Sequence, residues 1–280
     1  MTFDSILTII QAQALFVFAY DLGRYLIGAS LITVLVWALK RTPVKARTIQ
    51  PRSAKAQDIT REILSSIRSV AVYAVFSIVI IAAFQAGIFK SLPRQSVMID
   101  LAYLAAILLA HDAYFYWTHR AMHHPKLFAR FHSHHHKTIT PTPWTAYSFD
   151  VGEAVVMMAF MPLWFSMVPT PNAVIFAFLA IMILRNCMGH AGFELHPRWW
   201  LANPLTRWIS TTTHHDLHHC GSFTHNYGFY FTFWDKLTGT EHPRYAERFD
   251  EVTGRPLEGW GAKPATRPIR ASVAVSNQSA

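Results

Sequence analysis

The sequence has few charged residues, and it contains no histidine before position 111. Asp, Glu, Lys and Arg make up 15% of the 280 residues, whereas they make up about a quarter of ordinary soluble domains. Hydrophobic residues reach 52% and aromatic residues 14%. This composition excludes a typical soluble domain and indicates a membrane protein.

Several motifs are also missing. The two cysteines, Cys187 and Cys220, form no CxxC pair, which favours reduced thiols in a reducing compartment. No HExxH, GxGxxG or nucleic-acid-binding motif accompanies the formal charge of +9. We therefore expect the positive charge to orient the chain in a bilayer, and we expect no nucleic-acid partner.

Five apolar stretches indicate helices in a membrane: 25–39, which the mixed stretch 5–20 can lengthen, and 69–89, 97–117, 151–168 and 172–184. The last two are short and are separated by Pro169 and Pro171, which is typical of a tight hairpin. A buried hairpin in a soluble core is the alternative for this pair. The predicted fold is all-α, a multi-pass membrane helical bundle.

Basic residues predict the orientation of this bundle. Eight follow the first apolar stretch: Lys40, Arg41, Lys45, Arg47, Arg52, Lys55, Arg61 and Arg68. The 90–95 link carries only two, so the positive-inside rule places 40–68 in the cytoplasm. An even number of later crossings returns the chain to that face, so we expect a cytoplasmic, histidine-rich helical cap.

The chain divides into three predicted parts. Residues 1–96 hold N-terminal membrane helices and the basic linker, and residues 97–243 hold all the clustered histidines. Residues 244–280 are polar, and we expect them to form a flexible tail.

The histidines recur at helical spacings. His119 and His123 are four residues apart, as are Asn186 and His190, and two HxxHH groups are present: His132, His135 and His136, and His215, His218 and His219. On a helix, positions i, i+3 and i+4 share one face, so each group is expected to point at one shared centre. The same geometry turns other histidines away from that centre: His111, His124, His134 and His214.

The nine selected histidines are too many for one metal ion, since a zinc site takes about four ligands. Two metals with four or five ligands each fit better, and imidazole suits Fe, Zn, Cu and Ni alike. A metal-bound histidine usually donates the N–H of its other ring nitrogen to an acceptor, and the candidate acceptors are Asp112, Asp216 and Asp235. A zinc-dependent membrane hydrolase and a membrane metal transporter remain as alternatives.

Four motifs carry a resemblance to a known family: HDAYFYWTHRAMHH, FHSHHHKTITPTPW, NCMGHAG and HHDLHHCGSFTHNYGFYFTFWDKLTGT. Over residues 97–243 the sequence resembles the fatty acid hydroxylase / sterol desaturase superfamily of integral-membrane di-iron oxygenases. Locally it is most similar to sterol C5-desaturases, in which NYG and WD follow HxxHH.

The resemblance implies two iron ions as cofactors, O₂ as co-substrate and a lipid substrate. It implies metal ligation by His119, His123, His132, His135, His136, His190, His215, His218 and His219, with Asn186 reaching iron through water. It favours hydroxylation, with C5-desaturation of a sterol as the alternative. Since no electron-carrying domain is visible, we expect an external donor, either a cytochrome b5-like protein or a ferredoxin with its reductase.

Overall fold

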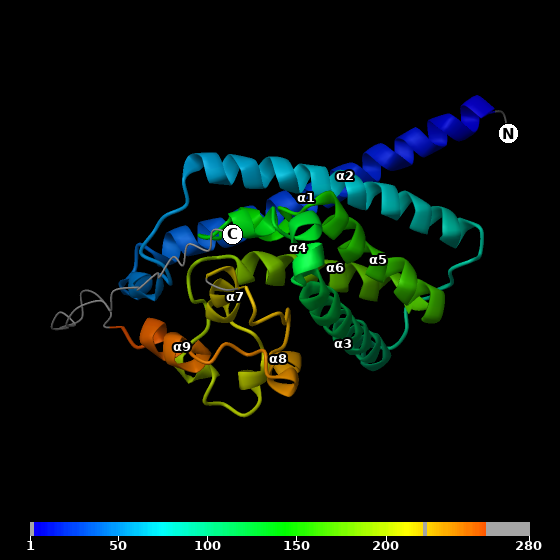
Figure 1. Ribbon diagram of the computed structural model, residues 1–280. Helices are drawn as coiled ribbons and strands as arrows, with labels where there is room; N and C mark the ends of the chain where they lie inside the picture. The colour runs from blue at the N-terminus through cyan, green and yellow to red at the C-terminus, as the bar shows by residue number, and fades with distance from the viewer. Residues whose placement is uncertain (1–2, 221–222, 256–280) are drawn as a thin grey trace.

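The computed structural model describes residues 3–220 and 223–255, and nearly all of its regular structure is helical (Figure 1). The prediction of an all-α fold is confirmed. The strands in the described residues are two short segments of two residues each, β1 (Ser91–Leu92) and β2 (Thr170–Pro171).

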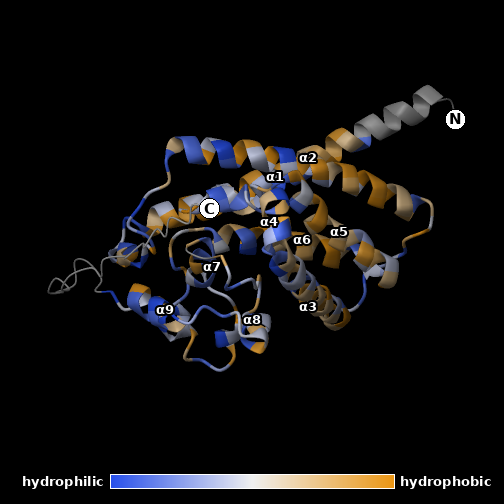
Figure 2. Cartoon of the chain, in the orientation of Figure 1, coloured by the Kyte–Doolittle hydropathy of each residue, from blue (hydrophilic) through white to orange (hydrophobic). Residues whose placement is uncertain are grey.

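Four helices are long and apolar enough to cross a membrane: α1 (Phe3–Leu39, of which Gln13–Leu39 qualifies), α2 (Ala56–Gln85), α3 (Val97–Met122) and α6 (Asn172–Gly189). Helix α5 (Val151–Met167) is apolar but shorter. Exposed apolar side chains such as Ile27, Val79 and Leu109 cover these helices, and Figure 2 shows the apolar colouring concentrated on them. This surface identifies a membrane protein, because water would not favour so much exposed apolar area.

Helices α2 and α3 extend beyond their predicted apolar stretches at one end. Helix α2 begins at Ala56 with polar turns that contain the Arg61–Asp58 ion pair of 2.6 Å. Helix α3 is capped by Ser96, which accepts from the backbone N–H of Ile99, and it continues to Met122. The prediction from hydropathy did not include the first turns of α2 or the last turn of α3, because these turns are polar.

The two ends of the bundle differ in character. Strands β1 and β2 pair in parallel, so the α2–α3 connection and the α5–α6 turn lie together at one end. At the other end the basic linker contacts the histidine-rich segments: the Ile49 N–H donates to the Gly192 carbonyl, and Gln50 Nε2 donates to Asp216 Oδ1 at 2.9 Å. The linker and these segments therefore share one face, as the count of crossings predicted (Figure 1).

The segment that follows His136 enters the bundle as the 3-10 helix η3 (Pro143–Tyr147). The Tyr147 ring stacks on Tyr25 of α1 at 5.6 Å between centroids, and it meets Tyr73 of α2 edge-on at 5.1 Å. The Trp144 carbonyl accepts a hydrogen bond from the Tyr25 hydroxyl. These buried contacts fix the chain that follows His136.

Short helices complete the face that carries the histidines: α4 (Pro125–Phe131), η2 (His135–Lys137), η4 (Arg198–Trp200), η5 (Thr206–Trp208), α7 (Thr212–His219), α8 (Phe233–Thr238) and α9 (Tyr245–Thr253), with η1 (Pro43–Arg47) in the linker. Helix α9 corrects the predicted tail, since Tyr245, Phe249 and Val252 are buried. Residues 256–280 of that tail lie outside the described residues.

Candidate metal centre

The nine predicted histidines converge in two adjacent clusters. We call them the first cluster (His119, His123, His132, His136 and His218) and the second cluster (His135, His190, His215 and His219). Within each cluster, one nitrogen of every ring lies within 4.8 Å of those of all the others. The structure therefore brings together the side chains that the spacing selected, in groups of five and four.

Five segments supply these rings. His119 lies in the last turn of α3, and His123 caps that helix. His132 caps α4, and His135 and His136 form most of η2. The remaining four follow α6 or lie on α7: His190, His215, His218 and His219.

The structure corrects the expectation that each HxxHH group serves one centre. On α7, His215 and His219 join the second cluster and His218 joins the first. Consecutive helical residues diverge by about 100°, so His218 and His219 point to opposite sides of their shared face. In the other HxxHH group, His132 and His136 join the first cluster and His135 joins the second, although η2 and the turn before it are not α-helical.

Ring nitrogens face each other at short distances inside each cluster. In the first cluster His119 Nε2 is 2.9 Å from His132 Nε2, and His123 Nε2 is 3.2 Å from His218 Nε2. In the second, the Nε2 of His190 is 2.9 Å from that of His215. Metal–nitrogen bonds of about 2.0–2.1 Å place neighbouring ligand nitrogens about 3–3.4 Å apart in octahedral or tetrahedral sites.

The opposite nitrogen of most rings donates to a backbone carbonyl. The Nδ1 atoms of His119, His135, His190, His218 and His219 lie 2.8–3.3 Å from the carbonyl oxygens of Tyr227, Ser148, Asn186, His225 and Thr138, respectively. A carbonyl only accepts, so the proton sits on Nδ1 and the lone pair on Nε2. Facing lone pairs cannot hydrogen-bond to each other, so this donor set fits a bound cation.

Burial keeps these imidazoles in the neutral form that binds metals. Desolvation, followed by neighbouring imidazoles, lowers the pKa of His123 to about 2. Burial lowers the pKa of His190 to about 4. Neutral rings at pH 7 are therefore ready to coordinate a cation without first losing a proton.

In the part of the chain that the structure describes, none of the three candidate aspartates accepts a hydrogen bond from a ring nitrogen of the clustered histidines. Asp112 accepts from the backbone N–H groups of Tyr230 and Phe231, and Asp216 accepts from Gln50. Asp235 accepts from the backbone N–H groups of Tyr227 and Gly228. Asp235 therefore acts on the site indirectly. It holds the Tyr227–Gly228 peptide, and the carbonyl of that peptide orients His119.

Sequence reasoning missed Glu153. Its Oε1 lies 2.8 Å from His132 Nδ1, and the two side chains are 3% and 2% exposed. The only signal was an acid in the otherwise uncharged stretch 151–168, where a carboxylate needs a buried partner.

Asn186 and the four rejected histidines lie outside the clusters. Asn186 donates from Nδ2 to the Ala146 carbonyl at 2.6 Å, and its water-mediated metal contact stays a prediction. His134 Nε2 lies 2.7 Å from Ser65 Oγ, and His214 Nε2 lies 3.4 Å from Asp235. His124 caps α4, and His111 packs among aromatic rings.

Helix α7 is anchored by a buried carboxylate. Glu194 accepts from the backbone N–H of Thr213 and from both the backbone and Nδ1 of His196, each at 2.8 Å. Burial alone would raise the pKa of Glu194, but these hydrogen bonds hold it below its usual value. The anchor fixes the start of the helix that carries three clustered histidines.

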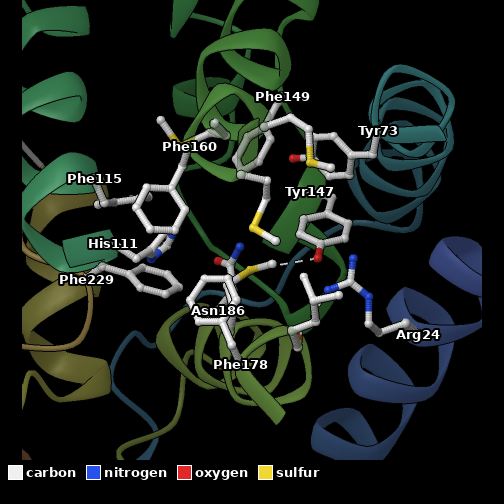
Figure 3. Close-up of a pocket in the computed structure, with 15 residues that line it drawn as sticks. Arg24, Tyr73, His111, Phe115, Tyr147, Phe149, Phe160, Phe178, Asn186 and Phe229 are labelled. Atoms are coloured by element: carbon white, nitrogen blue, oxygen red, sulfur yellow. Dashed lines mark hydrogen bonds between the residues drawn. The ribbon is translucent and has the colours of Figure 1, made fainter. Parts of the chain in front are cut away.

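A narrow cavity of about 50 Å³ adjoins the clusters inside the helical bundle (Figure 3). Most of its wall is aromatic or methionine, including Phe115, which contacts the His119 ring, and Phe149, which contacts the His135 ring. A smaller cavity of about 10 Å³ shares Asn186 and Phe229 with it and reaches His215. The larger cavity is therefore separated from the clusters by Phe115 and Phe149, and the smaller one reaches the second cluster at His215.

Comparison with known proteins shows similarity to one described family. Residues 104–240 match the family model for fatty acid hydroxylases. The chain is 38% identical over 151 residues to the very-long-chain aldehyde decarbonylase GL1-5 of Oryza sativa subsp. indica. The aligned region covers 50% of this chain and 24% of that protein. It is 34% identical over 134 residues to the Delta(7)-sterol 5(6)-desaturase ERG3B of Gibberella zeae, covering 48% and 39%.

The very-long-chain aldehyde decarbonylase CER1 of Arabidopsis thaliana is 35% identical over 132 residues, which cover 45% of this chain and 21% of that protein. The chain thus spans well under half the length of these curated relatives. No solved structure matches it. The similarity to the superfamily and to sterol desaturases that the motifs predicted is confirmed.

Proposed function

Because residues 104–240 match the family model for fatty acid hydroxylases, we propose that the protein is a membrane-bound, O₂-dependent di-iron oxidoreductase that hydroxylates a lipid. The observation that carries this proposal is the pair of histidine clusters beside an apolar cavity in the bundle. Nine neutral imidazoles with their lone pairs turned inward suit redox-active metals that keep open positions for a co-substrate.

The chain's own residues have three tasks in such a reaction. The first and second clusters would each hold one iron, and the carbonyls and Glu153 keep the rings in place. When bound, the iron pair supplies the redox chemistry that activates O₂ and oxidises an unactivated C–H bond. The cavity receives the apolar part of the lipid and excludes water from the reacting carbon.

The proposed topology places the clusters on the cytoplasmic side. The basic linker that contacts them has exposed Lys40, Arg41, Lys45, Arg52 and Lys55. This positive surface suits an acidic external electron donor, either a cytochrome b5-like protein or a ferredoxin with its reductase. With the true donor, turnover should fall as the salt concentration rises, and turnover that ignores salt would contradict this docking surface.

Desaturation of a sterol is the second candidate, and the similarity to the sterol desaturase of Gibberella zeae favours it. The NYG and WD motifs here support the first histidine cluster. Asp235 of WD binds the peptide of Tyr227 and Gly228, and the Tyr227 carbonyl orients His119. These motifs therefore support the shared centre and do not select one of the two reactions.

Lipid analysis tests the proposal directly. Membranes of cells expressing the full chain, and of cells expressing His135→Ala, are extracted and compared by mass spectrometry. A new lipid heavier by one oxygen supports hydroxylation, and one lighter by two hydrogens supports desaturation. An unchanged lipid profile, together with zinc alone in protein from iron-replete cells, would favour the hydrolase, and metal transport without lipid change would favour the transporter.

A further inference from the structure

The cavity beside the clusters has a few polar groups in an otherwise apolar wall. Methionines 157, 158, 161 and 182 and several phenylalanines line it. Unbranched methionine side chains adapt to the shape of a ligand. Figure 3 shows His111, Arg24, Tyr147 and Asn186 among these residues. Arg24 and Asn186 already donate to oxygens of the protein, whereas His111 Nδ1 has no hydrogen-bond partner in the part of the chain that the structure describes.

Arg24 is already paired within the protein. Arg24 donates to Asp21 Oδ1 at 2.7 Å and to the Leu179 carbonyl at 3.1 Å, and the Arg24 and Asp21 side chains are 11% and 7% exposed. Asp21 therefore neutralises the charge of Arg24 inside the bundle. A bound carboxylate would face a cation that is already paired, so the cavity favours an uncharged occupant.

The relative exposure of His111 is 7%, and its Nδ1 atom has no hydrogen-bond partner among residues 3–220 and 223–255. Five aromatic rings surround it, and those of Phe160, Phe178 and Tyr230 are centred 4.9, 5.2 and 5.6 Å away. The ring cannot swing toward another acceptor without displacing them. A buried polar atom that stays unpaired is costly, which points to a partner from outside the chain.

The position of His111 relates it to the metal centre. It lies two turns before His119 on α3, which is about 12 Å along the helix axis. Phe115 sits between them and contacts both rings. A polar group of a lipid bound at His111 would therefore determine which carbon of that lipid lies next to the clusters.

We propose that His111 is a specificity-determining residue that hydrogen-bonds an uncharged oxygen of the lipid substrate, such as a hydroxyl or an aldehyde carbonyl. The inference rests on the proposed function, because it takes the cavity to be the lipid site. The oxygen replaces the missing partner of the imidazole, while the phenylalanines and methionines enclose the hydrocarbon.

Direct binding tests this proposal without any turnover. The full chain, purified in detergent, is titrated with tritiated octadecanol, octadecane and octadecanoate, and with cholesterol and its 3-deoxy analogue. These probes compare an oxygen function with its absence on a straight chain and on a sterol skeleton, and an alcohol with a carboxylate. Variants His111→Phe, which keeps an aromatic ring, and His111→Gln, which keeps a hydrogen-bonding group, are titrated beside the wild type.

On at least one skeleton, the wild type should bind the alcohol roughly tenfold more tightly than its hydrocarbon, and octadecanoate should bind more weakly than octadecanol. His111→Phe should abolish the preference for the alcohol, and His111→Gln should retain most of it. A preference that survives in His111→Phe, equal binding of alcohol and hydrocarbon, preferred binding of the carboxylate, or no binding of either alcohol would overturn the inference. Failure of the di-iron proposal would appear separately, in the metal content.

Discussion

Removal of the Glu153 carboxylate should weaken metal binding in the first cluster. Its oxygen lies 2.8 Å from His132 Nδ1, and both side chains are almost fully buried, so solvent screens the interaction little. Removing one partner of a buried polar contact leaves the other partner unpaired, which costs about 1–3 kcal/mol. We therefore expect Glu153→Leu to lower the affinity of this cluster for iron by about 10–100-fold.

The assay is iron retention by purified full-length protein during titration with a chelator. Asp216→Asn is the matched control, because Asp216 is also buried but accepts from Gln50 and not from a clustered ring. It should retain iron within about threefold of the wild type. Equal losses in the two variants, or wild-type retention by Glu153→Leu, would refute the assignment of Glu153 as the residue that positions His132.

Three further predictions test other parts of the structure. His135→Ala should reduce iron toward one per chain and abolish turnover, whereas His134→Ala should keep both; equal loss would contradict the division of the histidines. Glu194→Gln should destabilise the protein by about 2 kcal/mol at pH 7. Because the pKa of Glu194 is lowered, its stabilisation is present above about pH 4.5 and lost below it, so the difference in Tm should shrink there; a difference independent of pH would contradict this. Gly228→Ala should lower Tm and release iron, since a Cβ there would overlap a backbone carbonyl, whereas Gly23→Ala has open space; equal behaviour of these two variants would refute this.

Helical spacing and the number of membrane crossings were enough to predict which histidines meet. Positions such as His119 and His123, or His215 and His219, are selected by local geometry. The basic linker then predicted that all of them share one face, and its contact with Asp216 agrees with that prediction.

The sequence was not enough to predict how the rings divide between clusters. His135 and His136 lie in a short 3-10 turn, whose rotation differs from that of an α-helix. The partners of the far nitrogens were also hidden, because most are backbone carbonyls brought near by tertiary packing, such as that of Tyr227. Glu153 and His111 stood within apolar stretches, and their surroundings became visible only in the folded bundle.

Metal analysis combined with Mössbauer spectroscopy tests the central claim most directly. The full chain would be purified from iron-replete cells, and the metal bound per chain would be counted and identified. The account predicts two irons per chain in nitrogen-rich environments, falling toward one in His135→Ala. One iron or none in the wild type, or zinc in its place, would contradict it.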